Sequence, residues 1–320
     1  MSGFEDVAGK FQFDLAADSD AAIRSVAFAE VRRLADLHGN LTSQHLADGF
    51  QFLGERIRFV NPQRGIFKPR QMQHLLSIRT VFAARGRRVW YDDQREVHQQ
   101  IFSGDDSVDY SFMGTNPDAA DNRWLRDAME LQIPIVYFLG VAPGFYQALL
   151  PAFIVDWNAT TLSAKIAFSA SDVASAAPQT VAERRYALRQ VKQRLHQASF
   201  RQMVISAYDG KCAISGLPEP LLLDAAHIVD DGNEKYGQPV ISNGVPLSKI
   251  HHAAFDAQLI GIDPDFRIHV SRKLLDMRDG PTLEALRQFD GRDLRRPRRE
   301  KDWPDKDRLA LRFERFKAAA

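Results

Sequence analysis

Four polar residues in the C-terminal third of the chain have types and spacing that suit acid–base and metal chemistry. They are His227, Asn243, His252 and Asp256, separated in turn by 15, 8 and 3 residues. His252 and Asp256 stand at i and i+4 of a predicted helix, so one face presents an imidazole and a carboxylate that can hold a divalent cation. His227, left without metal, can accept a proton from water. A base beside a cation is an arrangement for phosphodiester hydrolysis.

A strand, a loop and a helix must position these residues. The sequence LLLDAAHIV predicts a strand with His227 near its end. A polar loop follows, and VPLSKIHHAAFDAQL predicts a helix over residues 245–259. The next segment, IGIDPDFRIHV, predicts a hairpin over residues 260–270 that turns at Asp-Pro-Asp. The amide of Asn243, in the loop, is placed to hydrogen-bond the backbone near His227 and to fix the aim of the imidazole.

The segments CAISG, LLLDAAHIV and NGVPLSKIHHAAFD together resemble an HNH endonuclease, a member of the ββα-metal nuclease group. The branch that they resemble has an Ala-Ala-His-Ile first element and a His-His-x-x-x-Asp last element. The resemblance covers roughly a quarter of the chain. It implies that His227 is the general base, Asn243 the orienting residue, and His252 and Asp256 the ligands of a divalent cation, Mg²⁺ or Mn²⁺.

The sequence departs from that family at two places. Many HNH enzymes carry a metal-binding Asp or His immediately before the base, where this chain has Ala226. Asp224 lies on the same strand face as position 226, so it either supplies the missing oxygen, directly or through water, or is a solvated or salt-bridged residue. Many relatives also have two CxxC zinc knuckles. Because Cys212 is the single cysteine, we expect no structural zinc and no internal disulfide.

The neighbouring His251 requires a separate interpretation. One residue along a helix corresponds to a rotation of about 100°, so His251 and His252 cannot both face one cation. The i+4 partner Asp256 selects His252. His251 is then either a donor to a DNA phosphate or a surface residue. Lys249, one turn before His252, is a further candidate for phosphate contact.

The distribution of charge points to nucleic acid more clearly than the net charge of +1. Residues 56–88 contain nine Lys or Arg and no Asp or Glu, whereas residues 92–130 contain ten acidic and three basic residues. Clustered arginines suit phosphate binding, although they could instead form a solvated face balanced by the acidic segment. The candidates outside the HNH-like core, from this stretch and from a second basic stretch at 184–211, are Arg64, Lys68, Arg70, Arg87, Arg88, Arg189, Lys192 and Arg201.

The whole chain of 320 residues is long enough for separate cores, and its element pattern predicts an α+β protein. The first segment is either winged-helix-like or a helical cap. The β-rich module is expected to be a small barrel similar to SRA or PUA-type domains, which flip a base into an aromatic pocket. Its pocket candidates, with core packing as the alternative, are Phe67, Trp90, Tyr91, Tyr110 and Trp124. The sequence predicts five divisions. Residues 1–75 form a helical segment, residues 76–168 a β-rich recognition module and residues 169–183 a linker. Residues 184–280 form a ββα-metal HNH nuclease domain with a leading basic helix, and residues 281–320 form a basic extension.

The chain resembles predicted restriction endonucleases with a C-terminal HNH domain. This resemblance implies a defence enzyme that cuts double-stranded DNA, plain or modified, at a target chosen by the N-terminal region. The alternatives are a nicking or homing-type HNH nuclease that reads plain sequence, and a DNA-binding regulator with an inactive nuclease core. A homodimer is expected, because double-strand cleavage requires two such sites. With no signal-peptide pattern and no membrane-length apolar run, we expect a cytoplasmic protein.

Overall fold

A computed structural model describes residues 5–80, 106–171, 176–233, 235–278 and 280–319. The chain divides into two compact units, Met1–Leu195 and His196–Ala320, and each is described by itself. The division falls within the helix α5, Val181–Ala207. Among the described residues, no helix has the length and apolar character that a membrane crossing requires.

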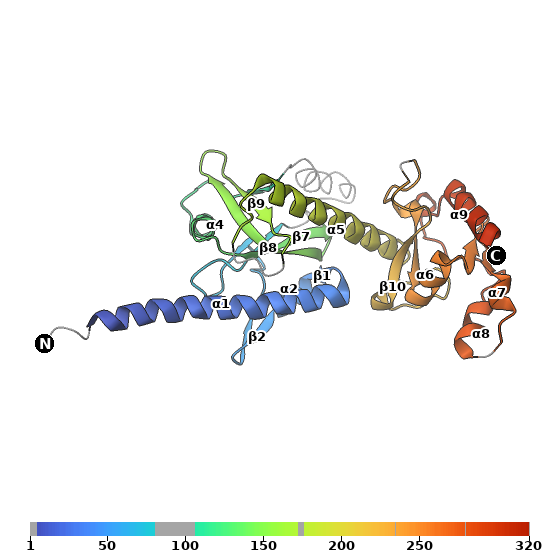
Figure 1. Cartoon of the computed structure of the whole chain (residues 1–320), viewed down its shortest axis with the longest axis horizontal. Helices are drawn as coiled ribbons and strands as arrows, with labels where there is room; N and C mark the ends of the chain where they lie inside the picture. The colour runs from blue at the N-terminus through green and yellow to red at the C-terminus, as the bar shows by residue number, and fades with distance from the viewer. Residues whose placement is uncertain (1–4, 81–105, 172–175, 234, 279, 320) are drawn as a thin grey trace. The chain divides into compact units, whose positions relative to one another are not determined.

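The N-terminal unit is built on a curled, half-barrel sheet (Figure 1). The strands follow the order β4-β5-β7-β8-β9-β6, with β1 paired to β8. The pair β5–β7 is parallel and the other pairs are antiparallel. Every residue of β7 is buried, as its continuous apolar run requires. The strands are β1 Leu41–Thr42, β4 Ile66–Phe67, β5 Ser77–Thr80, β6 Val108–Ser111, β7 Ile135–Ala142, β8 Phe145–Asn158 and β9 Ser163–Phe168.

The helices of this unit are α1 Glu5–His38, α2 Ser43–Asp48 and α4 Ala120–Glu130. Thr42 caps α2, because its hydroxyl accepts a hydrogen bond from the His45 amide. Strands β2 Phe50–Phe52 and β3 Glu55–Ile57 form a separate hairpin. Since β1 and β4 join the sheet, the predicted helical segment 1–75 and the β-rich module share one unit. The winged-helix and SRA- or PUA-like identities stay predictions.

The aromatic residues proposed for a base pocket have different environments. Tyr110 is buried, and its ring meets Tyr137 edge-on at a centroid separation of 6.0 Å. Phe67 and Trp124 are half-buried. Trp90 and Tyr91 lie outside the described residues. Tyr110 is therefore a core residue of the unit, which is the alternative that the sequence left open.

The C-terminal unit contains a ββα arrangement. Strand β10, Leu223–His227, pairs antiparallel with β11, Gly244–Ser248, and the helix α6, Lys249–Asp256, follows directly. A second hairpin, β12 Ile260–Ile262 and β13 Ile268–Val270, confirms the predicted one. The remaining helices are α7 Arg272–Leu275, α8 Pro281–Arg287 and α9 Lys306–Ala319, with single 3-10 turns at Pro220–Leu222, Ile241–Asn243 and Glu300–Asp302.

The prediction of one helix over 245–259 was wrong at its beginning. Residues 244–248 form β11, in which Leu247 lies opposite Asp224 and Gly244 opposite His227. Val245 and Leu247 are fully buried, so this segment is held by the core and by pairing with β10. Ser248 then caps α6, since its side chain accepts a hydrogen bond from the amide of His251. The i,i+4 relation of His252 and Asp256 survives, because both lie within α6.

The segment 281–320, expected to be a basic extension, contributes to the core of the unit. Leu309 and Phe316 of α9 are buried. Phe316 packs on Gly261 of β12 so closely that a Cβ added at Gly261 would lie 2.6 Å from the phenyl ring. A side chain at position 261 would therefore displace α9, and the helix belongs to the folded unit.

Candidate active site

The ββα elements bring three of the predicted metal-site residues together. His252 Nε2 lies 3.2 Å from Asp256 Oδ2, and His252 Nδ1 lies 3.7 Å from Asp224 Oδ2. The side chains are 26%, 58% and 39% exposed for His252, Asp256 and Asp224. The imidazole therefore has a carboxylate at each ring nitrogen, and both carboxylates are open to solvent.

His227, at the end of β10, is held against an aromatic ring. Its imidazole stacks on Phe200 of α5, with centroids 4.0 Å apart and an interplanar angle of 14°. Burial lowers the pKa of His227 below its ordinary value, although the nearby carboxylates of Asp231 and Asp230 act in the opposite direction. The imidazole is thus neutral at neutral pH, as a proton acceptor must be.

Gly244 lies opposite His227 in the β10–β11 pair, and its lack of a side chain leaves room for the Phe200 ring. A Cβ at Gly244 would lie 2.7 Å from Phe200 Cζ and would also collide with Val204. The glycine is required here for its small volume, since its φ of −134° suits any residue. Strand pairing and the packing of α5 together fix the plane of the His227 ring.

Asn243 is fully buried and bonds the backbone beyond His227, as predicted. Its Oδ1 accepts a hydrogen bond from the Val229 amide at 2.9 Å, and its Nδ2 donates to the Val229 carbonyl at 2.9 Å and to the Gln238 carbonyl at 3.1 Å. The Ile228 amide in turn donates to the Asn243 carbonyl. These bonds fix the chain directly after His227 and so help to hold the position of its imidazole.

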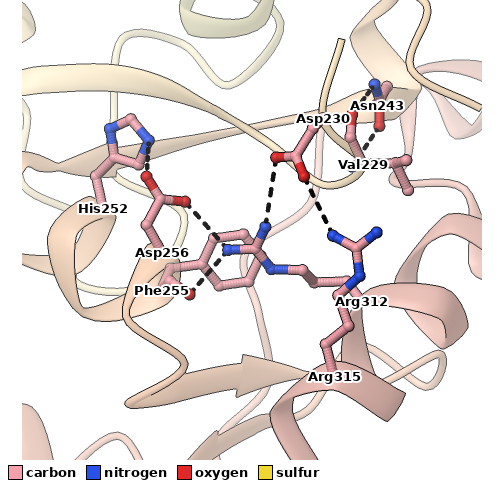
Figure 2. A network of polar contacts seen from close by, with 8 residues as sticks. All are labelled: Val229, Asp230, Asn243, His252, Phe255, Asp256, Arg312 and Arg315. Atoms are coloured by element: carbon pink, nitrogen blue, oxygen red, sulfur yellow. Dashed lines mark hydrogen bonds and ion pairs between the residues drawn. The ribbon is translucent and has the colours of Figure 1, made fainter. Parts of the chain in front are cut away.

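Arg312 of α9 contacts the site and was missed in the sequence, whereas Arg315 of the same helix pairs with Asp230 (Figure 2). Arg312 Nη2 donates to Asp256 Oδ1 at 3.1 Å, and Arg315 Nη1 lies 3.1 Å from Asp230 Oδ2. The signal was the position of Arg312 on the apolar stripe of α9, between Leu309 and Phe316 at i, i+3 and i+7. A charged residue on a buried stripe indicates a specific partner.

The site fits a cation that keeps part of its water shell. Among the residues that the structure describes, no three His, Cys, Asp or Glu side chains converge in a way that could hold a metal ion. The separation of 3.2 Å between His252 Nε2 and Asp256 Oδ2 nevertheless matches the spacing of about 3 Å between adjacent ligands in an octahedron of radius ~2.1 Å. Two protein ligands with several waters is an arrangement that Mg²⁺ accepts.

Comparison with known proteins identifies this part of the chain. Residues 212–263 match the model of the HNH endonuclease family, over a segment that includes β10, β11, α6 and β12. The chain carries an HNH endonuclease domain. The matched segment contains His227, Asn243, His252 and Asp256, and it ends well before α9.

Two solved structures match most of the chain at low identity and low TM-score. One is described as a modification dependent TagI restriction endonuclease; it is 14% identical, the match covers 89% of each chain, and the TM-score is 0.32. The other is described as the Type IV phosphorothioation-dependent restriction endonuclease ScoMcrA; it is 17% identical over 78% of this chain and 65% of that one, with a TM-score of 0.28. No curated protein matches the chain.

Within the HNH domain, the sequence left His251 as either a donor to a DNA phosphate or a surface residue, and the structure buries it instead. His251 is 7% exposed, its Nδ1 lies 2.7 Å from Ser248 Oγ and 3.5 Å from Cys212 Sγ, and its ring meets Phe289 edge-on. Burial raises the pKa of Cys212, but hydrogen bonds from His251, Ser215 and Ser248 outweigh it and hold the pKa at about 6. His251 is therefore part of the core rather than a phosphate donor.

Arg201 was also expected to be available for phosphates, and the structure gives it another role. Its Nη2 donates to the carbonyls of Pro220 and Leu223 at 2.9 and 2.8 Å, and its Nε lies 4.0 Å from Asp224 Oδ1. Arg201 thus ties α5 to the start of β10. Lys249, the other candidate for phosphate contact near the site, is exposed at the beginning of α6.

The N-terminal phosphate candidates divide between paired and exposed side chains. Arg64 pairs with Asp121 at 3.1 Å while staying 55% exposed, and Arg70 is 83% exposed beside Glu55. Lys68 donates to the Met72 carbonyl and lies over the Trp124 ring, so its ammonium is already used. Of the others, Arg189 is exposed, Lys192 is half-buried, and Arg87 and Arg88 lie outside the described residues.

Proposed function

We propose that the chain is a metal-dependent DNA endonuclease of restriction type, whose HNH domain cuts the phosphodiester bond. The observation that carries the proposal is the separation of two functions in one ββα unit. His227 is a half-buried, neutral imidazole on β10, whereas His252 and Asp256 present two ligand atoms 3.2 Å apart on α6. A base and a cation site with distinct environments are the two parts that phosphodiester hydrolysis needs.

In this proposal His227 accepts a proton from water. The water oxygen attacks phosphorus, the bond from phosphorus to the 3′ oxygen breaks, and the departing oxygen takes a proton from solvent. Phe200 holds the imidazole plane and Asn243 holds the chain beyond it, so the ring need not reorient during the reaction. When bound by His252 and Asp256, the cation supplies positive charge against the developing negative charge on the phosphate.

Asp224 acts on His252 in our proposal, and the other ring nitrogen of His252 would hold the cation. Its carboxylate is near Nδ1, whereas Asp256 is near Nε2. A carboxylate at one nitrogen fixes the tautomer and orientation of a ligand histidine and raises its basicity. In this assignment Nε2 of His252 would be the nitrogen that holds the cation.

The N-terminal unit chooses the target in this proposal. The base and the cation act on a phosphate, which is the same in every sequence, so specificity must come from other contacts. The exposed guanidinium of Arg70 in the N-terminal unit, and exposed Lys249 in the HNH domain, are candidate contacts to the DNA backbone. The two similar structures are described as modification-dependent enzymes, so modified DNA belongs in the test.

The deciding experiment compares wild type with His227→Ala on plasmid DNA at saturating Mg²⁺ or Mn²⁺. The substrates are unmodified, methylated, hydroxymethylated and phosphorothioated plasmids. We expect His227→Ala to retain DNA binding and to lose cleavage by about 10²- to 10⁴-fold, because the general base is removed. A matched control is His269→Ala, which removes a histidine from β13 that pairs with Asp263.

Each outcome selects one interpretation. If wild type and His227→Ala are equally inactive on all four substrates, the result would favour a DNA-binding regulator with an inactive nuclease core. Equal cutting of all four plasmids by wild type would exclude modification dependence and favour an enzyme that reads plain sequence. Nicked product without linear product would favour the nicking type.

A further inference from the structure

The C-terminal helix α9 reaches the metal half of the site through one buried side chain. We infer that Arg312 is a positioning residue for Asp256, a role that rests on the proposed function and adds to it. Arg312 lies outside the segment that matches the HNH endonuclease family. The active site of this chain thus depends on a helix some 50 residues beyond α6.

The contacts of Arg312 are those of a side chain built into the domain. It is only 5% exposed. Its Nη2 donates to the Phe255 carbonyl at 2.9 Å and to Asp256 Oδ1 at 3.1 Å, and its Nη1 lies 4.0 Å from Asp230 Oδ1. Its guanidinium carbon lies 4.3 Å from the centroid of the Phe255 ring. Figure 2 shows the guanidinium between Asp256 and Asp230, over the ring of Phe255.

The two oxygens of Asp256 therefore have different partners. Oδ1 accepts from Arg312, whereas Oδ2 faces His252 Nε2. Asp256 is the last residue of α6 and its side chain is 58% exposed, so little else restrains its rotamer. By taking Oδ1, the guanidinium turns Oδ2 toward the place where His252 presents its nitrogen. A carboxylate fixed in this way offers one oxygen to a cation.

Burial of this arginine is costly in a purely structural role. It occupies the apolar stripe of α9 between Leu309 and Phe316, where an apolar side chain would pack without desolvating a charge. Its Nε has no hydrogen-bond partner among the residues described. The arginine is accordingly best explained by what it holds, which is the end of α6 and the Asp256 carboxylate.

Arg315 supplies a matched control on the same helix. It is 53% exposed and pairs with Asp230 at 3.1 Å, so it shares the acidic partner of Arg312 but not the contact with Asp256. Removing either arginine takes away one positive charge near the site. Only Arg312→Gln removes the group that orients the cation ligand.

The test uses the full chain and measures Mn²⁺ binding by calorimetry without DNA, alongside cleavage. We expect Arg312→Gln to weaken Mn²⁺ affinity about 10- to 100-fold, the range for partners of metal ligands. Arg312→Lys should recover part of this loss, since an ammonium keeps the charge but not both hydrogen bonds. Arg315→Gln should change the affinity less than about twofold, as expected of an exposed pair.

A double mutant shows whether Arg312 acts through Asp256. In an Asp256→Asn background, Arg312→Gln should cause no further loss of Mn²⁺ affinity, because the oriented carboxylate is already gone. Unchanged or tighter Mn²⁺ binding by Arg312→Gln, or an equal loss in both backgrounds, would overturn the inference. If Arg312→Gln does not fold, unchanged affinity in Arg312→Lys would overturn it instead.

Failure of the proposed function has a separate signature. Wild-type protein that neither binds Mn²⁺ nor loses cleavage on His227→Ala would overturn the proposed function. Wild-type protein that binds Mn²⁺ and depends on His227, with Arg312→Gln unaffected, would overturn only the role of Arg312.

Discussion

The two faces of α6 place neighbouring histidines in opposite surroundings. His251 is 7% exposed and lies among Ser248, Cys212 and the ring of Phe289. His252 is 26% exposed and lies between the carboxylates of Asp224 and Asp256. A rotation of about 100° separates the two side chains. One face of α6 is held by buried hydrogen bonds and packing, and the other by charges that reach solvent.

This difference separates a structural face from a chemical face on one short helix. On the buried face, Ser248 and His251 bond each other and help to cap α6, so the start of the helix is rigid. On the open face, His252 has a carboxylate at each ring nitrogen, an arrangement that attracts a cation. The rigid face therefore fixes the direction in which the open face points.

The strongest test of this comparison is His252→Ala. We expect cleavage to fall by more than about 100-fold, because a cation ligand contributes at least as much as the partners that orient it. The free energy of unfolding should change by less than about 0.5 kcal/mol, since the side chain is partly exposed outside the core. Plasmid cleavage and urea unfolding of the same preparation measure the two quantities.

His251→Ala is the internal control for that experiment, one residue away. Loss of stability in His252→Ala comparable to that in His251→Ala would show that both faces are structural. Full cleavage by His252→Ala would remove this residue from the proposed cation site.

Much of the chemical face could be predicted from sequence, because its residues lie close together in the chain. His252 and Asp256 are related by one helical turn, and the pairing of β10 with β11 places His227 beside the same helix. Asn243 could be predicted as a backbone anchor for the same reason. Local spacing carries this information even though residues 244–248 form a strand rather than helix.

The buried face and the arginine network could not be predicted in this way. Burial of His251 depends on Cys212, 39 residues earlier, and on Phe289, 38 residues later. Arg312 meets Asp256 across 56 residues, and Arg201 meets the carbonyl of Leu223 across 22. Each contact depends on tertiary packing that periodicity does not encode. The predictions for His251 and Arg201 were wrong for this reason, because both side chains contact residues that are distant in the sequence.

His251→Ala should have the second largest effect, and it should act on stability. Removing the imidazole takes away one hydrogen-bond partner of Ser248 Oγ and one of the buried Cys212 Sγ, and it opens space beside Phe289. We expect a loss of about 2 kcal/mol in the free energy of unfolding, at about 1 kcal/mol for each hydrogen bond lost. Cleavage below the unfolding transition, at saturating Mn²⁺, should stay within a few-fold of wild type.

Urea unfolding with and without Mn²⁺ distinguishes the two roles of these histidines. Mn²⁺ should stabilise His251→Ala as much as it stabilises wild type, because the cation ligands are intact. A loss of this stabilisation in His251→Ala would place the residue in the metal site and contradict the division between the faces.

The smallest expected effect concerns pH, and it extends the comparison from α6 to β10. Only neutral His227 accepts a proton, and burial lowers its pKa below the ordinary value of 6.5. Cleavage at saturating Mn²⁺ should therefore persist below pH 6.5 and then fall up to tenfold per pH unit as the imidazole is protonated. A bound cation shifts the midpoint in the same direction, since positive charge disfavours imidazolium.

Phe200→Leu should expose the His227 ring and move the midpoint of the pH profile upward, whereas His251→Ala should leave the midpoint unchanged. A wild-type midpoint above 6.5 would mean that the group limiting cleavage is not the half-buried His227.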